Sequence, residues 1–326
     1  MNEDEVVEAI RELVEPRGPA HRLRVKLGVG DDAALWQPSR SHRSAISTDM
    51  LVEGVDFTRD AMTLADAGWR AMAASASDLA AMGARPLLAT VALGVPQDMG
   101  LEEILELYRG LAACATRCKL RIVGGDLSRA EAWTIAITVV GEVRASHAKT
   151  RAAARPGDVL AVTGALGAAR AGLELTRKSE NIGDELVEGA LRAFRRPEPR
   201  VAEGRFLAAS RDVRAMMDLS DGLSTDVARL AAASGCGAEL ESIPVAESAW
   251  ALAQARGEDP ERFGLAGGED FELLAAIRPR AFSYLAGRFA ARFARRLSRV
   301  GLVRVEPGVV WNGAPAEPAG WDHFQP

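Results

Sequence analysis

Acidic residues occur along this chain in short clusters that also contain glycine, serine or threonine. The six clusters are Gly28-Val29-Gly30-Asp31-Asp32, Ser47-Thr48-Asp49, Ser77-Asp78, Gly124-Gly125-Asp126, Asp218-Leu219-Ser220-Asp221 and Gly267-Gly268-Glu269-Asp270. Carboxylates gathered at one place repel one another and any phosphate unless hard cations lie between them, and oxygen ligands suit Mg²⁺. The pattern predicts a phosphate site with several Mg²⁺ ions and phosphoryl transfer as its chemistry.

Each cluster taken alone also has a structural explanation. The Asp31-Asp32 turn is compatible with a helix cap or a solvated loop, and Ser77 or a backbone amide could satisfy Asp78. Asp218 and Asp221 could cap the helix that follows them. Six clusters, four of them directly after apolar runs, are hard to explain as independent loop features, so we expect them to converge in the folded chain.

The sequence lacks the common nucleotide and nucleophile motifs. Gly28-x-Gly30 has no third glycine and is followed by two carboxylates, which does not suit a dinucleotide fingerprint. No Gly-x4-Gly-Lys-Ser/Thr loop is present. The four histidines are scattered, and none stands beside a serine or cysteine in a recognisable nucleophile setting. A covalent hydrolase is therefore disfavoured.

Length and composition indicate a globular protein of two domains. The chain has 326 residues, of which 48% are hydrophobic and 26% charged. Its net charge of -5 gives no reason to expect nucleic acid or a membrane as partner, which favours a small molecule. The three cysteines complete no zinc set and predict buried thiols, and the acidic start is not a targeting signal. We expect a reducing, cytoplasmic setting.

Alternating strands and helices must position the acidic clusters, which indicates an α/β fold of the α+β type. Helices are expected at residues 4–14, 63–82 and 101–118 and from near 224, and strands at 44–48, 87–93, 120–123, 133–143, 159–163, 215–219, 271–277 and 297–305. Asp49 then ends a strand, and Gly124-Gly125-Asp126 forms a turn that points a carboxylate past a sheet edge. A change in composition over 145–158 predicts domains at residues 1–147 and 148–326.

Two further groups lie outside the acidic clusters. Lys149 and Arg151 begin the second domain and could balance an anionic ligand, although exposed basic residues are usually solvated. The aromatic group Trp321-Asp322-His323-Phe324 could anchor the tail or stack on a planar ring.

Taken together and in order, the clusters resemble those of the thiamine-monophosphate kinase family. The matching segments are Gly28–Ala34, Ser47–Gly54, Ser77–Ala84, Gly124–Asp126, Asp218–Leu223, Gly267–Asp270 and Gly320–Phe324. That family belongs to the superfamily of aminoimidazole ribonucleotide synthetase and selenophosphate synthetase. It uses ATP and several Mg²⁺ ions to convert thiamine monophosphate into thiamine diphosphate.

The resemblance implies a fold, an assembly and a set of roles. The N-terminal domain would hold ATP and Mg²⁺ in a mixed sheet with helices, and that sheet would join its counterpart across the axis of a homodimer. The active site would lie between this domain and a C-terminal α/β domain. The implied Mg²⁺ ligands are Asp32, Ser47, Thr48, Asp49, Asp78, Asp126, Asp218 and Asp221. ATP would contact Tyr108, Gly125, Asp126, Arg151 and Ser220, and the thiamine portion would contact Glu269 and Trp321.

Two positions depart from the family pattern. Asp56 stands where the family usually has histidine, and Ser75 stands where it usually has asparagine. The histidine position is a substrate contact in the family, so Asp56 is a candidate substrate-binding residue that takes a cation or faces the positive thiazolium.

The resemblance implies direct in-line transfer from ATP, with positioning and metal ions in place of a catalytic side chain. Another ATP-using enzyme of the superfamily remains an alternative, acting on formylglycinamidine ribonucleotide or selenide. Selenide is disfavoured because the sequence has no cysteine-bearing, glycine-rich N-terminal segment. A non-enzymatic regulatory module that binds divalent cations is the third alternative.

Overall fold

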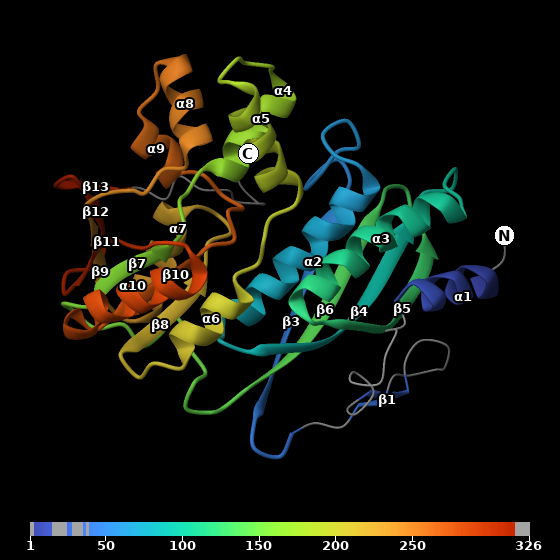
Figure 1. Ribbon diagram of the computed structural model, residues 1–326, viewed down its shortest axis with the longest axis horizontal. Coiled ribbons are helices and arrows are strands. Elements are labelled where there is room, and N and C mark those ends of the chain that lie inside the picture. Colours follow the sequence, from blue (N-terminus) through green and yellow to red (C-terminus); the bar gives the residue numbers. More distant parts are fainter. Residues whose placement is uncertain (1–2, 15–24, 28–34, 37–38, 317–326) are drawn as a thin grey trace. The chain divides into compact units, whose positions relative to one another are not determined.

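The computed structural model describes residues 3–14, 25–27, 35–36 and 39–316, and Figure 1 shows their arrangement. The cluster at Gly28–Asp32 and the aromatic tail that contains Trp321 lie outside these residues. The chain divides into two units, one of residues 1–79 and 84–145 and one of residues 80–83 and 146–326.

The first unit contains a four-stranded mixed sheet in the order β3-β6-β4-β5. Its strands are β3 (Arg43–Val52), β4 (Arg85–Val95), β5 (Arg121–Arg129) and β6 (Thr134–Val143). β6 pairs antiparallel with β3 and β4, whereas β4 and β5 are parallel and are joined by the helix α3 (Leu101–Cys118). The short strands β1 (Val25–Leu27) and β2 (Leu35–Trp36) pair separately.

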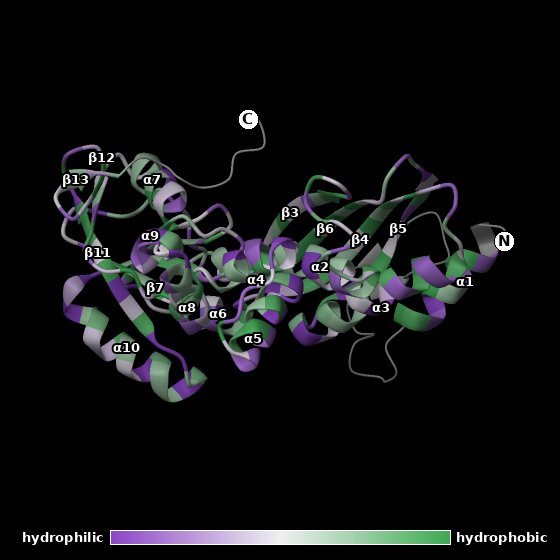
Figure 2. Cartoon of the chain, turned by 90° about the horizontal axis from the view of Figure 1, so that it is seen from above, coloured by the Kyte–Doolittle hydropathy of each residue, from purple (hydrophilic) through white to green (hydrophobic). Residues whose placement is uncertain are grey.

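Two long helices cover one face of this sheet (Figures 1 and 2). The alanine-rich α2 (Leu64–Ala81) and α3 approach closely, because a side chain on Gly68 would clash with the Leu107 carbonyl and one on Gly110 with the Ala65 carbonyl. Small residues on both helices therefore permit this close packing. The Glu103 side chain accepts a 2.9 Å hydrogen bond from Gly100 N–H and so caps the start of α3. The helix α1 (Glu3–Val14) contacts α3 and β5.

Two strands extend farther than the sequence predicts. β3 continues to Val52, so Asp49 lies within the strand and not at its end. β5 runs through Gly124-Gly125-Asp126, so the predicted turn there is wrong. A side chain on Gly125 would clash with the Val91 carbonyl of β4, which explains a glycine inside a strand. Glycine here permits close strand packing instead of a turn.

The second unit contains a seven-stranded sheet in the order β13-β12-β9-β11-β7-β10-β8. Its strands are β7 (Val159–Thr163), β8 (Val213–Asp218), β9 (Gly237–Leu240), β10 (Leu273–Ile277), β11 (Leu297–Arg304), β12 (Gly308–Trp311) and β13 (Ala314–Pro315). All neighbours are antiparallel except β9 and β12.

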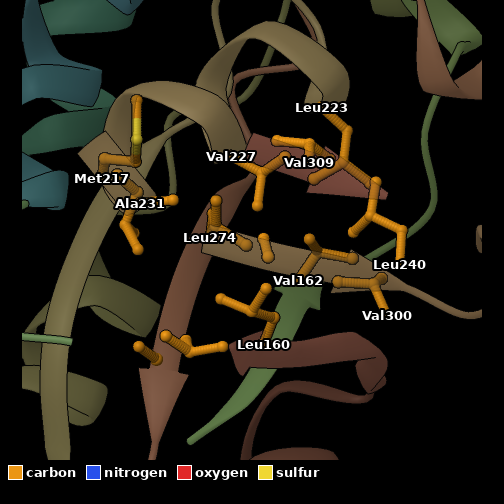
Figure 3. Close-up of a cluster of buried hydrophobic side chains, with 14 of the residues drawn as sticks. Leu160, Val162, Met217, Leu223, Val227, Ala231, Leu240, Leu274, Val300 and Val309 are labelled. Atoms are coloured by element: carbon orange, nitrogen blue, oxygen red, sulfur yellow. The ribbon is translucent and has the colours of Figure 1, made fainter. Parts of the chain in front are cut away.

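Both faces of this sheet are buried. Leu160, Val162 and Leu274 face a cluster formed with α7 (Leu223–Ala233), which Figure 3 shows. The alternate residues Ala161 and Ala275 face α6 (Val201–Ala208) and α10 (Pro279–Phe293). Full burial of an aliphatic side chain contributes about 1.5–3 kcal/mol, so the two clusters stabilise the central strands strongly. Hydrophilic and hydrophobic residues both occur around α10, as expected for a helix with one buried side (Figure 2).

Four further helices complete the second unit. They are α4 (Ala168–Arg177), α5 (Asp184–Arg195), α8 (Glu247–Arg256) and α9 (Pro260–Leu265). Asp259 caps α9 by accepting hydrogen bonds from Glu261 N–H at 2.8 Å and Arg262 N–H at 3.3 Å. The three cysteines are buried free thiols, as predicted. None of the helices described is both long and apolar enough to cross a membrane.

Candidate functional site

Three predicted metal ligands come together in the first unit. Ser47 and Asp49 lie on the helix-covered face of β3, two residues apart, and Asp78 lies on α2. The Ser47 hydroxyl donates to an Asp78 carboxylate oxygen, and Asp49 and Asp78 repel one another. Two carboxylates and a hydroxyl from separate elements therefore form one acidic group.

Within this acidic group, Asp49 is the residue whose pKa is clearly raised. Burial, then the charge of Asp78, raises the pKa of Asp49 to about 6, and the neighbouring Ser75 side chain opposes the shift only in part. Its Oδ2 atom is buried and has no hydrogen-bond partner. A buried carboxylate oxygen without a donor is costly. No cationic side chain of the described residues is among the groups that stabilise it. This oxygen fits a divalent cation.

Thr48 and Asp126 lie on the opposite face of the sheet. Asp126 pairs with Ala92, and the same cross-strand row continues through Ala136 to Met50. Asp49 pairs with Ile137 in the adjacent row, whose side chains point to the other face. β3 and β5 are the two edge strands, so three strand spacings of about 4.8 Å put roughly 14 Å between Asp49 and Asp126. One cation cannot contact both carboxylates of a single chain.

Three other predicted residues of this unit have structural roles in the chain. The Gly125 backbone packs against β4, as described above. Tyr108 on α3 is 3% exposed, and burial raises its pKa. The Asp56 carboxylate accepts a 2.7 Å hydrogen bond from Val52 N–H and closes the turn after β3. Ser75, the other departure from the family pattern, is buried, and its hydroxyl donates to the Ala71 carbonyl at 3.3 Å.

The second unit brings two predicted motifs side by side. The segment from Asp218 to Gly222 follows β8, and the segment from Gly267 to Glu272 leads into β10. Glu269 N–H donates to the Ser220 carbonyl at 2.7 Å and Phe271 N–H to the Leu219 carbonyl at 3.0 Å. These bonds continue the pairing of β8 and β10 beyond the sheet. Asp218, Ser220, Asp221 and Glu269 therefore belong to one loop pair.

Two residues on α7, Asp226 and Arg229, hold the segment from Asp218 to Gly222 in place. Neither was identified as a site residue from the sequence. The fully buried Asp226 accepts hydrogen bonds from Ser220 N–H and Asp221 N–H, both at 3.1 Å. Burial, then the charge of Asp221, raises its pKa to about 6. Arg229 pairs with both Asp221 and Asp226. The acidic residue in the first turn of the predicted helix was the available sequence signal.

The second loop contains two non-glycine residues with left-handed backbone. The φ angles are +65° at Glu269 and +47° at Phe271. Such conformations cost of order 1–3 kcal/mol each and persist only where the surrounding structure imposes them. Asp270, between them, accepts hydrogen bonds from Gly167 N–H at 2.6 Å and Ala169 N–H at 3.2 Å at the start of α4.

The two basic residues at the start of the second unit differ. Lys149 is buried and donates to the carbonyls of Ser210 at 2.9 Å and Val213 at 2.7 Å. Burial lowers its pKa. Its role is structural, so the suggestion that it balances a ligand is wrong. The Arg151 side chain is exposed, while its carbonyl accepts a 2.7 Å hydrogen bond from Ser234.

The acids form small groups and not one cluster within the described residues. In residues 3–14, 25–27, 35–36 and 39–316, no three His, Cys, Asp or Glu side chains are close enough to hold a metal ion. Asp32 and Trp321 lie outside these ranges. Convergence of all six clusters on shared cations stays a prediction.

Comparison with known proteins connects this geometry to a family. Residues 30–143 match the family described as AIR synthase related protein, N-terminal domain, and residues 155–282 match its C-terminal domain. Thiamine-monophosphate kinase of Rhodopirellula baltica is 38% identical over 274 residues, which cover 81% of this chain and 80% of that protein. The chain belongs to the thiamine-monophosphate kinase family. The family predicted from the motifs is confirmed, and with it the prediction of an enzyme.

Solved structures of this family have the same fold. Thiamine-monophosphate kinase from Stenotrophomonas maltophilia K279a superposes with a TM-score of 0.86 at 31% identity, covering 97% of this chain and 98% of that one. AaThiL complexed with AMPPCP and TMP gives a TM-score of 0.78 at 28% identity, covering 99% of this chain and 97% of that one. The mixed α/β class predicted from the sequence is confirmed.

Proposed function

We propose that this protein transfers the γ-phosphoryl group of ATP to thiamine monophosphate and so forms thiamine diphosphate. The observation that carries the proposal is the buried, unpartnered Oδ2 of Asp49 beside Asp78 and Ser47, in a chain of the thiamine-monophosphate kinase family. The family member solved with the ATP analogue AMPPCP and with TMP supports this choice of substrates.

The residues of the first unit suit Mg²⁺. Asp49 and Asp78 offer carboxylate oxygens and Ser47 a hydroxyl, all hard ligands of the kind Mg²⁺ takes. We assign further Mg²⁺ contacts to Asp32, Thr48, Asp126, Asp218 and Asp221, as the family pattern implies. Bound Mg²⁺ would offset the repulsion between two phosphates and stabilise charge on the departing ADP.

The other assigned residues bind and orient the two substrates. The exposed Arg151 would pair with ATP phosphate, and Tyr108, Gly125, Asp126 and Ser220 complete the ATP contacts that the family implies. Glu269 and Trp321 would meet the thiamine portion, whose thiazolium charge suits a carboxylate and an aromatic ring. Asp56 is assigned to the substrate on the same grounds, although its carboxylate also closes a turn.

The acceptor needs no general base. The terminal phosphate of thiamine monophosphate is already anionic near neutral pH, so its oxygen attacks the γ-phosphorus of ATP directly. One P–O bond forms to that oxygen while the bond from the γ-phosphorus to ADP breaks, without a phosphorylated enzyme. Catalysis then consists of positioning and electrostatic stabilisation.

We also propose a homodimer that uses the exposed face of the first sheet. Ile46 and Met50 on β3 are 68% and 59% exposed, and Asp126 lies on the same face. A second copy packed on this face would cover the apolar side chains. It would also bring the Asp126 of one chain near the β3 of the other, which a single chain cannot do. Light scattering should give twice the chain mass, and Met50→Lys should give the monomer; a monomeric wild type would contradict the proposal.

The three buried free thiols suit a reducing compartment, so we propose a cytoplasmic setting. A chain that loses activity under glutathione-buffered reducing conditions would contradict it.

One coupled assay of ADP release tests the function. Purified protein with ATP and Mg²⁺ is given thiamine monophosphate, formylglycinamidine ribonucleotide or no acceptor. We expect ADP release only with thiamine monophosphate, together with an equal amount of thiamine diphosphate. Release only with the purine precursor would indicate another enzyme of the superfamily, and binding of Mg²⁺ without ADP release would indicate a regulatory module.

A further inference from the structure

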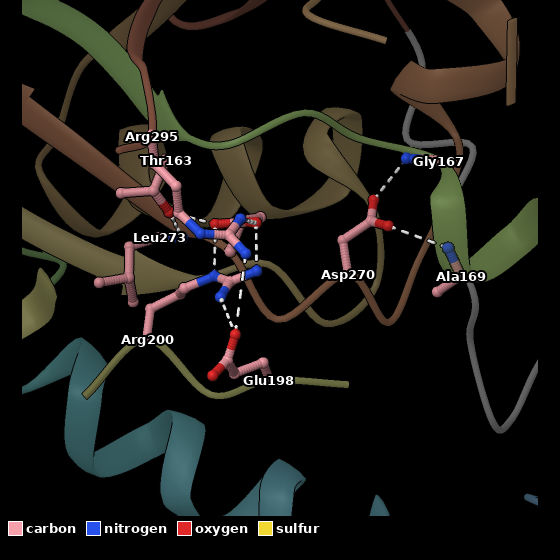
Figure 4. A network of polar contacts seen from close by, with 9 residues as sticks. Thr163, Gly167, Ala169, Glu198, Arg200, Asp270, Leu273 and Arg295 are labelled. Atoms are coloured by element: carbon pink, nitrogen blue, oxygen red, sulfur yellow. Dashed lines mark hydrogen bonds and ion pairs between the residues drawn. The ribbon is translucent and has the colours of Figure 1, made fainter. Parts of the chain in front are cut away.

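Two carboxylates directly after Glu269 hold the segment that carries it, the partly buried Asp270 and the buried Glu272. Asp270 accepts hydrogen bonds from Gly167 N–H and Ala169 N–H at the start of α4. Two residues later, Glu272 is 3% exposed and accepts from Arg200 Nε at 2.9 Å and Arg200 Nη2 at 2.8 Å. Figure 4 shows both sets of contacts.

Glu272 is the centre of a larger network. Thr163 Oγ1 donates to it at 2.5 Å and also accepts from Leu273 N–H at 2.8 Å. Arg295 Nη1 lies 3.4 Å from Glu272 Oε1 and also pairs with Glu198. A side chain on Gly164, whose φ is +68°, would clash with the Glu272 carboxylate. The backbone after β7 is therefore shaped around this carboxylate.

Stability alone does not explain this network. Two paired charges in a protein interior lose their hydration, and an apolar pair of equal volume often stabilises a fold as well or better. Directional bonds to a buried carboxylate instead fix one conformation of the backbone that carries it. That backbone contains Glu269 and Phe271 in the left-handed region, a conformation that a freely moving chain would leave.

We propose that Asp270 and Glu272, with Arg200 as the partner of Glu272, are positioning residues that hold Glu269 in the orientation that binds thiamine monophosphate. Asp270 fixes the loop to the start of α4, and Glu272 fixes the next residues to Thr163 at the end of β7. The strained residues Glu269 and Phe271 flank Asp270 and cannot relax while these contacts hold, so the Glu269 backbone stays beside the Ser220 carbonyl. The proposal rests on the proposed function for the identity of the substrate.

The test compares variants at this network with a matched ion pair at the other end of β10. Glu272→Gln removes the charge, and Thr163→Val removes the hydroxyl without changing the side-chain volume much. Asp212→Asn is the control, because Asp212 pairs with Arg278 next to the far end of the same strand. Each variant is measured by amide hydrogen exchange of the full chain without substrates and by steady-state kinetics for both substrates.

We expect exchange at the Glu269 and Phe271 amides to rise about tenfold or more in Glu272→Gln and less in Thr163→Val, with the central residues of β10 protected. The KM for thiamine monophosphate should rise about fivefold or more, while the KM for ATP changes less than about twofold. The control Asp212→Asn should change neither the exchange at Glu269 and Phe271 nor the KM for thiamine monophosphate. If Glu272→Gln does not fold, Thr163→Val decides with the same two readouts.

Unchanged exchange at Glu269 and Phe271 in a folded variant would overturn the proposal, whatever the activity. Faster exchange with an unchanged KM for thiamine monophosphate would overturn the link to the substrate. A wild type that binds ATP but does not phosphorylate thiamine monophosphate would refute the proposed function instead, and the exchange data would then decide alone whether the two carboxylates fix the loop.

Discussion

The acidic residues of the two units differ in what balances their charge. In the first unit, Asp49 on β3 and Asp78 on α2 repel one another, and the Ser47 hydroxyl donates to Asp78. In the second unit, Asp221 pairs with Arg229, and Glu272 pairs with Arg200. Among the described residues, no cationic side chain pairs with Asp49 or Asp78, whereas Asp221 and Glu272 each have an arginine partner. We infer that Asp49 and Asp78 bind an external cation, and that paired acids such as Glu272 support the loops.

The largest expected effect is on turnover, from Asp49→Asn. The substitution removes a carboxylate oxygen that no donor satisfies, so the chain should fold at least as well without Mg²⁺. Turnover should fall about 1,000-fold, which is roughly 4 kcal/mol in the barrier. Coupled ADP release and thermal unfolding measure the two quantities. Full activity in Asp49→Asn would contradict the inference that the acids of the first unit bind the catalytic cation while those of the second unit support loops.

Arg200→Met should affect stability most. The variant leaves Glu272 buried without its bidentate partner, while the contacts from Arg295 and Thr163 remain. Loss of one partner of a buried pair costs about 3–5 kcal/mol, and we expect the lower end here. Urea unfolding measures the free energy, and Arg200→Met with Glu272→Leu should regain much of the loss. A single variant as stable as wild type would show that the pair is not needed.

The pH dependence of stability tests Asp270. Burial, with smaller contributions from Glu272 and Glu269, raises its pKa to about 7, although two N–H groups oppose the shift. An unfolded aspartate titrates near about 3.9, so between about pH 4 and 7 the folded chain keeps a proton that the unfolded chain has lost. This contribution makes the protein less stable as the pH rises through that window. Urea unfolding at several pH values gives the free energy of unfolding as a function of pH. Between about pH 4 and 7 this free energy should fall less steeply in Asp270→Asn than in the wild type, by the equivalent of about one proton. The same steepness in both proteins would refute the assignment.

Arg229→Gln should have the smallest effect. Arg229 is 43% exposed, so solvent weakens its pairs with Asp221 and Asp226. We expect a loss below about 1 kcal/mol in thermal unfolding without Mg²⁺. A loss of unfolding free energy as large as that in Arg200→Met would show that the exposed Arg229 pairs stabilise the fold as much as the buried Arg200–Glu272 pair does.

Local signals in the sequence predicted the elements, and tertiary contacts decided the site. The helix at 101–118 was predicted with the observed bounds, because its apolar periodicity is a local feature. Gly124-Gly125 was taken for a turn, since the approach of the Val91 carbonyl that requires Gly125 comes from a distant strand. The same limit hid the role of Lys149, whose two carbonyl partners lie more than 60 residues away.

The candidate site shows the same division. The motif clusters named Ser47, Asp49 and Asp78, which the fold brings into one acidic group, and Ser220 and Glu269, which it brings into one loop pair. Arg200 and Asp226 were missed because each acts through a partner, and neither residue belongs to a glycine-bounded cluster. Sequence pattern identifies residues that serve ligands more readily than the residues that hold them in place.

Calorimetric titration of Mg²⁺ tests the central claim most directly. The wild type, Asp49→Asn and the ion-pair control Asp212→Asn are titrated in the presence of a non-hydrolysable ATP analogue. We expect binding heat in the wild type and in Asp212→Asn, and in Asp49→Asn either no binding heat or an Mg²⁺ affinity at least about tenfold weaker. Equal Mg²⁺ affinity in all three proteins would contradict the claim that the unbalanced acids of the first unit hold the metal ions.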